Sequence, residues 1–272
     1  MNISYAEYEA LPGVRWPDLK HMAKSPAHYL AHLEGEPVDS PAMLFGRACH
    51  CAVLEPVHLP EQFVVFDGAR RGGVWTEFRD ANAGKDILTR DEWDRVLGVQ
   101  AAVTAHPVAS KLLAGKGQNE VTITWRDTET DIACKSRLER LILPNGNGLG
   151  VIVDFKTTAD LDLHRFVRTV SELKYVSQLG MYRDGVQATF DRECRAVIIA
   201  AETKPPFDCG VFAVSSDDLW SGSDEFHALL SRLAECSESG EWPGRYPERV
   251  SLDLPPWAFG DADETDTIEV LK

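Results

Sequence analysis

Three strand-like runs in the middle of the chain constrain its fold more than any other feature. They cover residues 121–125, 132–143 and 151–155, and they alternate side-chain character or are rich in Val, Ile and Thr. Such side chains pack well on the pleated surface of a β-sheet. A polar turn separates the first two runs, and the glycine- and asparagine-rich loop 144–150 separates the last two. The sequence therefore predicts an antiparallel meander at the centre of the fold.

Helical patterns lie on both sides of this meander. Ser40 followed by Pro41 is typical of a helix N-cap with proline at the first helical position. Apolar residues recur at helical spacing after Thr89. Strands flanked by helices indicate an α/β (α+β) fold. The expected helices are 16–34, interrupted at Ser25-Pro26, 41–54, 89–113, 161–187 and 217–236, and further strands are expected at 195–202 and 209–214.

We expect a single domain over residues 1–259, with an N-terminal helical part (1–115) and a catalytic core (116–259). Residues 57–85 have no clear periodicity and contain the basic, glycine-rich run Ala69-Arg70-Arg71-Gly72-Gly73, which predicts an irregular, mobile loop. The last residues, 260–272, are acidic and predict a flexible, solvated tail.

The charge balance limits the possible partners. The chain has 272 residues and a formal net charge of −15, from 28 Lys and Arg against 43 Asp and Glu. A protein that binds nucleic acid through a basic surface alone would need clustered Lys and Arg, unless metal ions supply positive charge locally. No stretch approaches the ~20 apolar residues that span a bilayer, and the N-terminal residues do not resemble a signal peptide, so we expect no membrane association and a cytoplasmic protein.

The cysteines do not form a recognisable framework. None of the six belongs to a C-x-x-C pair, which argues against a disulfide scaffold or a zinc ribbon. A four-thiolate set is also absent, so we expect no iron–sulfur cluster.

The triplet Asp154-Phe155-Lys156 is the strongest candidate for chemistry. Residues i and i+2 of a strand share a face, so Asp154 and Lys156 project together. If the strands pair through loop 144–150, Glu139 lies beside Asp154. Two carboxylates and a lysine could hold Mg²⁺ or Mn²⁺ and stabilise negative charge. From spacing alone, an ordinary ion pair on an exposed strand face explains the triplet more simply.

Several short motifs in a fixed order alter that balance. They are Phe45-Gly-Arg-Ala-Cys-His50, Leu54-Glu-Pro56, Glu120-Val-Thr, Cys134-Lys-Ser-Arg-Leu-Glu139, Asp154-Phe-Lys-Thr-Thr158 and Tyr175-Val-Ser-Gln178-x-x-x-Tyr182. Through these motifs the chain resembles the exonuclease VIII (RecE-type) branch of the PD-(D/E)xK nuclease superfamily, whose relatives include lambda exonuclease and RecB-type nuclease domains. The resemblance implies a restriction-endonuclease-like core, a mixed sheet with an antiparallel meander flanked by helices.

The resemblance assigns roles to individual residues. It implies Lys156 as the catalytic lysine, with Gln178 and Tyr182, one helical turn apart, positioning the lysine or the DNA backbone. The family usually has Asp where this chain has Glu139, and the extra methylene moves the carboxylate. The implied metal ligands are His50, Glu139, Asp154 and the Phe155 carbonyl, with Glu120 as a carboxylate behind them or as a ligand of a second metal.

By the same resemblance, the chain would be an Mg²⁺-dependent deoxyribonuclease (Mn²⁺ being an alternative metal) acting on linear double-stranded DNA ends. The implied activity is a 5′→3′ exonuclease in phage- or prophage-type recombination, passing its product to a single-strand annealing recombinase. A homo-oligomeric ring around DNA is implied as well. Expected DNA contacts are Arg137, Arg70 and Arg71.

Two alternatives stay open at this point. A catalytically silent DNA-binding or assembly module with the nuclease fold would explain Glu139 and the acidic composition. A metal-dependent phosphatase or small-molecule hydrolase would act on free phosphoesters without any need for DNA ends.

Overall fold

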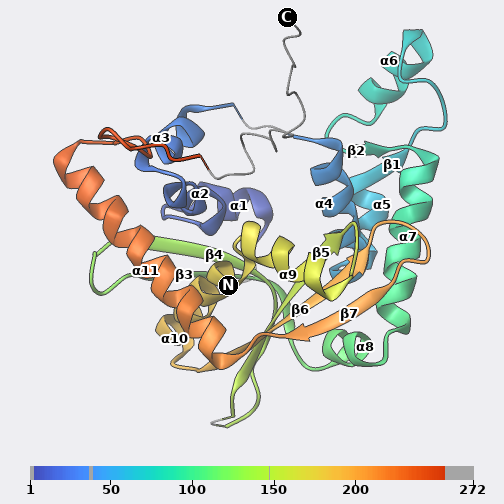
Figure 1. Cartoon of the computed structure of the whole chain (residues 1–272). Coiled ribbons are helices and arrows are strands. Elements are labelled where there is room, and N and C mark those ends of the chain that lie inside the picture. Colours follow the sequence, from blue (N-terminus) through green and yellow to red (C-terminus); the bar gives the residue numbers. More distant parts are fainter. Residues whose placement is uncertain (1–2, 37–38, 147, 255–272) are drawn as a thin grey trace, which may run out of the picture.

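The computed structural model describes residues 3–36, 39–146 and 148–254 and has a five-stranded mixed sheet at its centre (Figure 1). The strand order is β3-β4-β5-β6-β7; only β5 and β6 are parallel to each other. The predicted antiparallel meander and the mixed α/β class are confirmed. The strands are β3 (Gln118–Arg126), β4 (Ala133–Ile142), β5 (Gly150–Thr158), β6 (Cys194–Glu202) and β7 (Cys209–Ala213).

Helices cover both faces of this sheet. Alternate residues of β5 point to opposite sides: Val153 and Phe155 join a core with α4 and α7, whereas Ile152 joins a core with α9 and α10. A third cluster packs the N-terminal helices against α11. The helices are α1 (Tyr5–Ala10), α2 (Trp16–Leu19), η1 (Lys20–Ala23), α3 (Pro26–Glu34), α4 (Pro41–Leu54), η2 (Pro56–His58), α5 (Leu59–Gln62), α6 (Gly72–Ala81), α7 (Arg90–Ala105), α8 (Pro107–Ala114), α9 (Leu163–Glu172), α10 (Tyr175–Phe190) and α11 (Ser216–Ser239).

Close contact between α10 and α11 requires two glycines. A Cβ atom on Gly180 would lie 2.3 Å from the backbone nitrogen of Ser223, and one on Gly222 would lie 2.4 Å from the carbonyl oxygen of Val176. Any larger side chain would force the two helices apart. This crossing fixes α10, which carries Gln178 and Tyr182, against the rest of the molecule.

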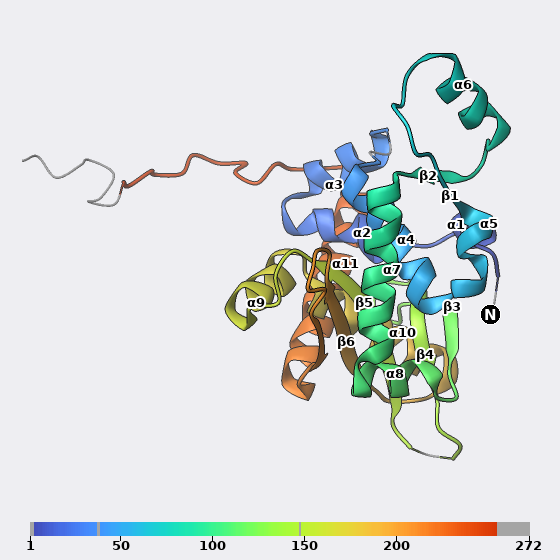
Figure 2. The same ribbon diagram turned by 90° about the vertical axis from the view of Figure 1, so that its right-hand side faces the viewer.

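The expected irregular loop at 57–85 is wrong. The segment contains η2, α5, the short strand β1 (Phe63–Val65) and helix α6, and β1 pairs in parallel with β2 (Asp86–Leu88). Both strands are only three residues long, too short to show alternation. Residues 66–85, which we call the arm, carry α6 and project from the body (Figures 1 and 2).

Three predicted helices are divided in the structure. The segment 161–187 breaks at Lys174, which adopts a left-handed conformation with φ 59° between α9 and α10. The segment 89–113 breaks at His106, because Pro107 has no N–H to continue the helix. The segment 16–34 forms α2, η1 and α3; its predicted interruption at Ser25-Pro26 is confirmed, because Ser25 caps α3 and Pro26 begins it. The predicted tail 260–272 lies outside the described residues.

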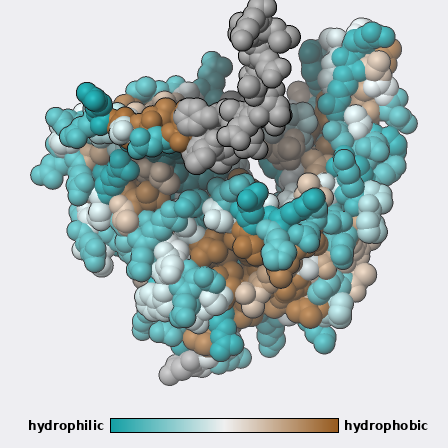
Figure 3. All heavy atoms as spheres, viewed as in Figure 1, coloured by the Kyte–Doolittle hydropathy of each residue, from teal (hydrophilic) through white to brown (hydrophobic). Residues whose placement is uncertain are grey.

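The surface is mixed in character. Figure 3 shows hydrophilic residues over most of the visible face, with an apolar area near its lower centre. Within the described parts of the chain, no helix combines the length and apolar character needed to cross a bilayer.

Candidate active site

The candidate site begins where pairing within the sheet lapses. The β3–β4 ladder skips the position of Glu120 and Glu139, and the β4–β5 ladder ends at Arg140 and Val153. Beyond that end, the Glu139 carboxylate accepts a hydrogen bond from the backbone N–H of Phe155. The Glu139 side chain thus takes the place of a main-chain acceptor for the N–H of Phe155. Because β4 and β5 are no longer paired here, their polar side chains can contact one another.

Lys156 joins the two carboxylates. Its Nζ lies 2.7 Å from Asp154 Oδ2 and 3.5 Å from Glu139 Oε1, and 5.0 Å from the ring centroid of Tyr175. The lysine and Glu139 side chains are each only 13% exposed, and Asp154 is 1% exposed. The predicted proximity of Glu139, Asp154 and Lys156 is therefore present in the structure.

His50 reaches the same cluster from α4. Ser40 caps this helix by accepting from the backbone N–H of Met43, which sets the helix start three turns or so before His50. His50 Nδ1 lies 3.3 Å from Glu139 Oε1, and its ring meets that of Phe155 edge-on with centroids 5.1 Å apart. The helix therefore brings an imidazole to the carboxylate pair.

Burial dominates the acid–base properties of the cluster. It raises the pKa of Glu139 to about 7 and that of Asp154 to about 6, even though Lys156 lowers both. Burial and the nearby ammonium lower the pKa of His50 to about 4, so its ring is neutral and keeps a lone pair. Burial also disfavours the Lys156 ammonium, but Asp154 and Glu139 outweigh it and raise the lysine pKa.

The donor set has the chemistry of a divalent-metal site. Of the two buried Asp154 oxygens, Oδ2 lies 2.7 Å from the Lys156 ammonium, whereas Oδ1 has no hydrogen-bond partner among the described residues. Uncompensated buried oxygens are costly, and a cation would satisfy them. Among the described residues, however, no set of three His, Cys, Asp or Glu side chains is arranged to hold a metal ion. Lys156 supplies the positive charge in this arrangement.

Gln178 and Tyr182 line the other side of the cluster. Gln178 Nε2 donates to Tyr182 Oη at 2.6 Å, along one turn of α10. Burial and the neighbouring Asp154 carboxylate raise the pKa of the Tyr182 hydroxyl. The neutral hydroxyl can donate onward, so the pair can orient a group near Asp154 and Lys156.

The structure engages Glu120 and Arg137 with each other. Arg137 Nε donates to Glu120 Oε2 at 2.6 Å, and its Nη1 donates to the carbonyl oxygen of Ile3 at 2.7 Å. Glu120 contributes to the raised pKa of Glu139, so the two carboxylates are electrostatic neighbours. Arg137 is 13% exposed and its guanidinium faces the N-terminal segment. Their predicted metal and DNA roles stay predictions.

The remaining predicted DNA contacts lie on the arm. Arg70 Nη2 donates to the carbonyl oxygen of Ile87, and the guanidinium lies 5.7 Å from the Trp75 ring centroid. Arg71 is exposed, and its side chain makes no hydrogen bond or ion pair with any described residue. Neither arginine reaches the carboxylate cluster directly.

Comparison with known protein families identifies the fold that carries this cluster. The model of the family "PDDEXK-like domain of unknown function (DUF3799)" matches residues 17–251. The chain belongs to this family. No curated protein matches it. The PDDEXK-like fold recurs in the crystal structure of a protein named "putative exonuclease" from Eubacterium rectale, with a TM-score of 0.62 and 12% identity over 96% of this chain and 99% of that one.

A second solved structure, SSO0001, gives a TM-score of only 0.31 at 14% identity, covering 84% of this chain and 87% of that one, which is too low to indicate a shared fold. The family match and the first structural likeness together show a PD-(D/E)xK nuclease superfamily fold.

Sequence reasoning missed Lys20, an electrostatic neighbour of Lys156. Burial lowers the pKa of this η1 lysine, and the Lys156 and Lys24 ammonium groups lower it further. Its position follows from the packing of the N-terminal helices against α11, and no local pattern in the sequence signals it.

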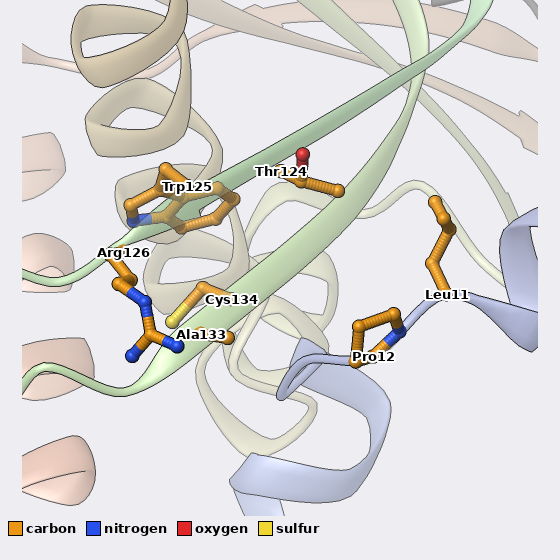
Figure 4. A pocket seen from close by; sticks show the side chains of 7 residues that line it. All are labelled: Leu11, Pro12, Thr124, Trp125, Arg126, Ala133 and Cys134. Atoms are coloured by element: carbon orange, nitrogen blue, oxygen red, sulfur yellow. The ribbon is translucent and has the colours of Figure 1, made fainter.

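A separate pocket lies elsewhere on the PDDEXK-like domain. Figure 4 shows it between the N-terminal turn at Leu11-Pro12 and the paired ends of β3 and β4. It shares no residue with the carboxylate cluster. Its lining residues are Leu11, Pro12, Thr124, Trp125, Arg126, Ala133 and Cys134.

Proposed function

We propose that the chain is a metal-dependent deoxyribonuclease that hydrolyses phosphodiester bonds of linear double-stranded DNA from its ends, in the 5′→3′ direction. The observation that carries the proposal is the placement of Lys156 against two buried carboxylates, of which Asp154 keeps one oxygen, Oδ1, without a hydrogen-bond partner among the described residues. A structural ion pair gains most when all its oxygens are hydrogen-bonded, and this one leaves Oδ1 unsatisfied.

His50, Glu139 and Asp154 would hold Mg²⁺, or Mn²⁺, with the Phe155 carbonyl assisting. When bound, the metal would lower the pKa of the attacking water and offset charge on the phosphoryl group. Lys156 is placed to stabilise the negative charge that develops during hydrolysis, because it is already held within this cluster.

The proposal extends to partners. A net charge of −15 opposes general attraction to DNA. A homo-oligomeric ring with basic groups facing its channel would reconcile this acidic composition with DNA binding. The product strand would pass to a single-strand annealing recombinase, in a phage- or prophage-type recombination system in the cytoplasm.

The test compares the wild type with Lys156→Ala on linear and covalently closed circular duplex DNA, each with Mg²⁺, Mn²⁺ or EDTA. Lys111→Ala, at an exposed position of α8, is the matched control. We expect nucleotide release from linear DNA only, lost with EDTA and in Lys156→Ala but kept in the control. End labels at 5′ or 3′ termini establish the direction. Cleavage of the closed circular DNA would indicate an endonuclease instead of an exonuclease.

A second candidate is a catalytically silent DNA-binding or assembly module. It is favoured by the engagement of Glu139, whose oxygens contact Phe155 N–H, Lys156 and His50. This candidate predicts DNA binding without cleavage under every metal tested. Cleavage by the wild type that disappears in Lys156→Ala would exclude it.

A further inference from the structure

The arm, residues 66–85, has a small aromatic cluster of its own. The Phe66 ring lies 5.0 Å from that of Trp75 and 4.9 Å from that of Phe78, measured between centroids. All three side chains are partly exposed, and α6 contains no buried residue. None of the three rings belongs to the buried core clusters of the body or packs against them. The arm therefore presents aromatic surface to solvent.

The same segment is slightly basic in an acidic chain. Its four basic residues stand against three acids, a net charge of +1 in a chain whose net charge is −15; they are Arg70, Arg71, Arg79 and Lys85 against Asp67, Glu77 and Asp80. Arg71 has no side-chain partner among the described residues, and a Cβ on Gly72 or Gly73 would meet no atom within 4 Å. Figure 3 shows the upper right of the molecule, where the arm lies, as mostly hydrophilic with a small apolar area. The Arg71 guanidinium is thus unpaired among the described residues and adjoins a backbone segment, Gly72-Gly73, with unoccupied space around it.

The root of the arm is tied to the helix that carries His50. Arg47 of α4 bonds Asp86, at the start of β2, with Nη2 to Oδ2 at 3.0 Å. Arg47 precedes His50 by three residues, so the two side chains lie on neighbouring turns of one helix face. Figures 1 and 2 both place α6 beyond β1 and β2, away from the central sheet. The root of the arm is therefore held by the same helix that carries His50.

We infer that the arm binds single-stranded DNA beside the active site, with an unpaired base stacking on Trp75 and a phosphate bound by Arg71. This inference rests on the proposed deoxyribonuclease function. Aromatic rings and free cations together are the elements of single-strand binding, because unpaired bases expose flat faces for stacking and phosphates line the strand. A duplex hides those faces, so the arm favours the strand left after hydrolysis or an unpaired end over paired DNA.

Two substitutions separate this role from a purely structural one. Trp75→Leu keeps an apolar side chain for packing against Phe66 but removes the aromatic face. Arg71→Ala removes a guanidinium that has no intramolecular partner, so it leaves the contacts within the arm intact. Arg79→Ala is the matched control, because Arg79 lies on the same helix but its guanidinium is paired with Asp80 at 2.8 Å.

The experiment measures fluorescence anisotropy of a labelled oligothymidylate and of a blunt duplex of equal length, in EDTA and in a Lys156→Ala background that prevents hydrolysis. We expect Trp75→Leu to weaken oligothymidylate binding by about tenfold, the loss typical of one stacked base. Arg71→Ala should weaken it less and lower the slope of log affinity against log salt by about 0.7. Duplex binding and Arg79→Ala should stay close to the unsubstituted values.

Unchanged oligothymidylate binding in both variants, an equal loss in Arg79→Ala, or an equal loss on the duplex would overturn the inference. The proposed function fails separately: a wild type that binds oligothymidylate through the arm but hydrolyses no DNA would refute the nuclease and keep the arm. If the wild type hydrolyses DNA but the arm variants bind oligothymidylate normally, the nuclease proposal stands and the arm inference is refuted.

Discussion

Two acid–base groups lie on neighbouring strands of one sheet, and they are built differently. Arg137 donates to Glu120 at 2.6 Å and to the Ile3 carbonyl, so that pair is well bonded. In the other group, one ammonium, that of Lys156, serves two carboxylates, and Asp154 Oδ1 has no hydrogen-bond partner among the described residues. A well-bonded buried ion pair makes the fold sensitive to the loss of either partner, whereas an incompletely bonded buried cluster keeps an oxygen available for a ligand.

The cause of the difference is the local state of the sheet. Arg137 pairs with Thr122 within the β3–β4 ladder, and only its partner Glu120 lies at the position that this ladder skips. The β4–β5 ladder has ended before both Glu139 and Asp154. Opening of these strands allows the Glu139 carboxylate to accept from Phe155 N–H. The comparison therefore assigns stability to the first group and chemistry to the second.

The largest expected effect is that of Asp154→Asn. Replacing the carboxylate by an amide of the same shape removes the implied metal ligand and the main partner of Lys156. We expect DNA hydrolysis to fall by roughly 10³-fold, a loss typical of removing one charge-stabilising group from an active site. Single-turnover rates on linear duplex DNA measure it. Asp160→Asn, at an Asp that pairs with Arg165 outside the cluster, is the control and should retain activity.

Arg137→Met should have the largest effect on stability. It leaves the Glu120 carboxylate without its cation at a position that is 19% exposed. Breaking a buried ion pair costs about 3 kcal/mol in the free energy of unfolding, more than we expect for Asp154→Asn. Urea unfolding monitored by circular dichroism measures both variants. Adding Glu120→Gln should restore part of the loss, because it removes the unpaired charge; no recovery would contradict the assignment of this pair to stability.

Some of the site could be predicted from the sequence because it follows from strand geometry. The two-residue period places Asp154 and Lys156 on one face, and the short 144–150 loop places Glu139 opposite Asp154. His50 could be included only through the family resemblance, since no spacing connects α4 to β5.

Other features depend on contacts that a single sequence does not encode locally. The break at Lys174 occurs without Pro or Gly, in a left-handed conformation that tertiary packing imposes. The arm was interpreted as a loop because α6 has no buried face and is held by contacts among Phe66, Trp75 and Phe78. The proximity of Lys20 to Lys156 likewise arises from packing of distant segments.

Tyr182→Phe probes the second group more finely. Gln178 donates to the Tyr182 hydroxyl at 2.6 Å. The substitution removes this hydroxyl and its hydrogen bond but keeps the aromatic ring. A hydrogen bond contributes about 1 kcal/mol, which corresponds to a loss of about fivefold to tenfold in kcat if the pair orients a reacting group. Steady-state kinetics on linear DNA measure it. A change in KM alone would indicate a role in DNA binding instead.

The smallest effect is expected at a third acid–base group, that of His227, which is more exposed than the two groups compared above. His227 of α11 contacts Asp184 of α10 at 3.1 Å and Asp127, after β3, at 3.3 Å. The hydrogen bond to Asp184 is the main cause that raises the pKa of His227, with the charges of Asp184, Asp127 and Glu129 adding to it.

A folded-state pKa above the unfolded value means that the protonated imidazole stabilises the fold. This stabilisation is complete below about pH 6.5, the unfolded pKa, and is lost as the pH rises through the higher folded value. Because His227 is 38% exposed, solvent screens the pair and the change in Tm should be small. We expect the wild-type Tm to fall across this window and His227→Gln to flatten the profile, as followed by thermal melting. The exposed His164→Gln serves as the control and should keep the wild-type slope; an unchanged slope in His227→Gln would show that this bridge, unlike the Glu120–Arg137 pair, adds nothing to stability.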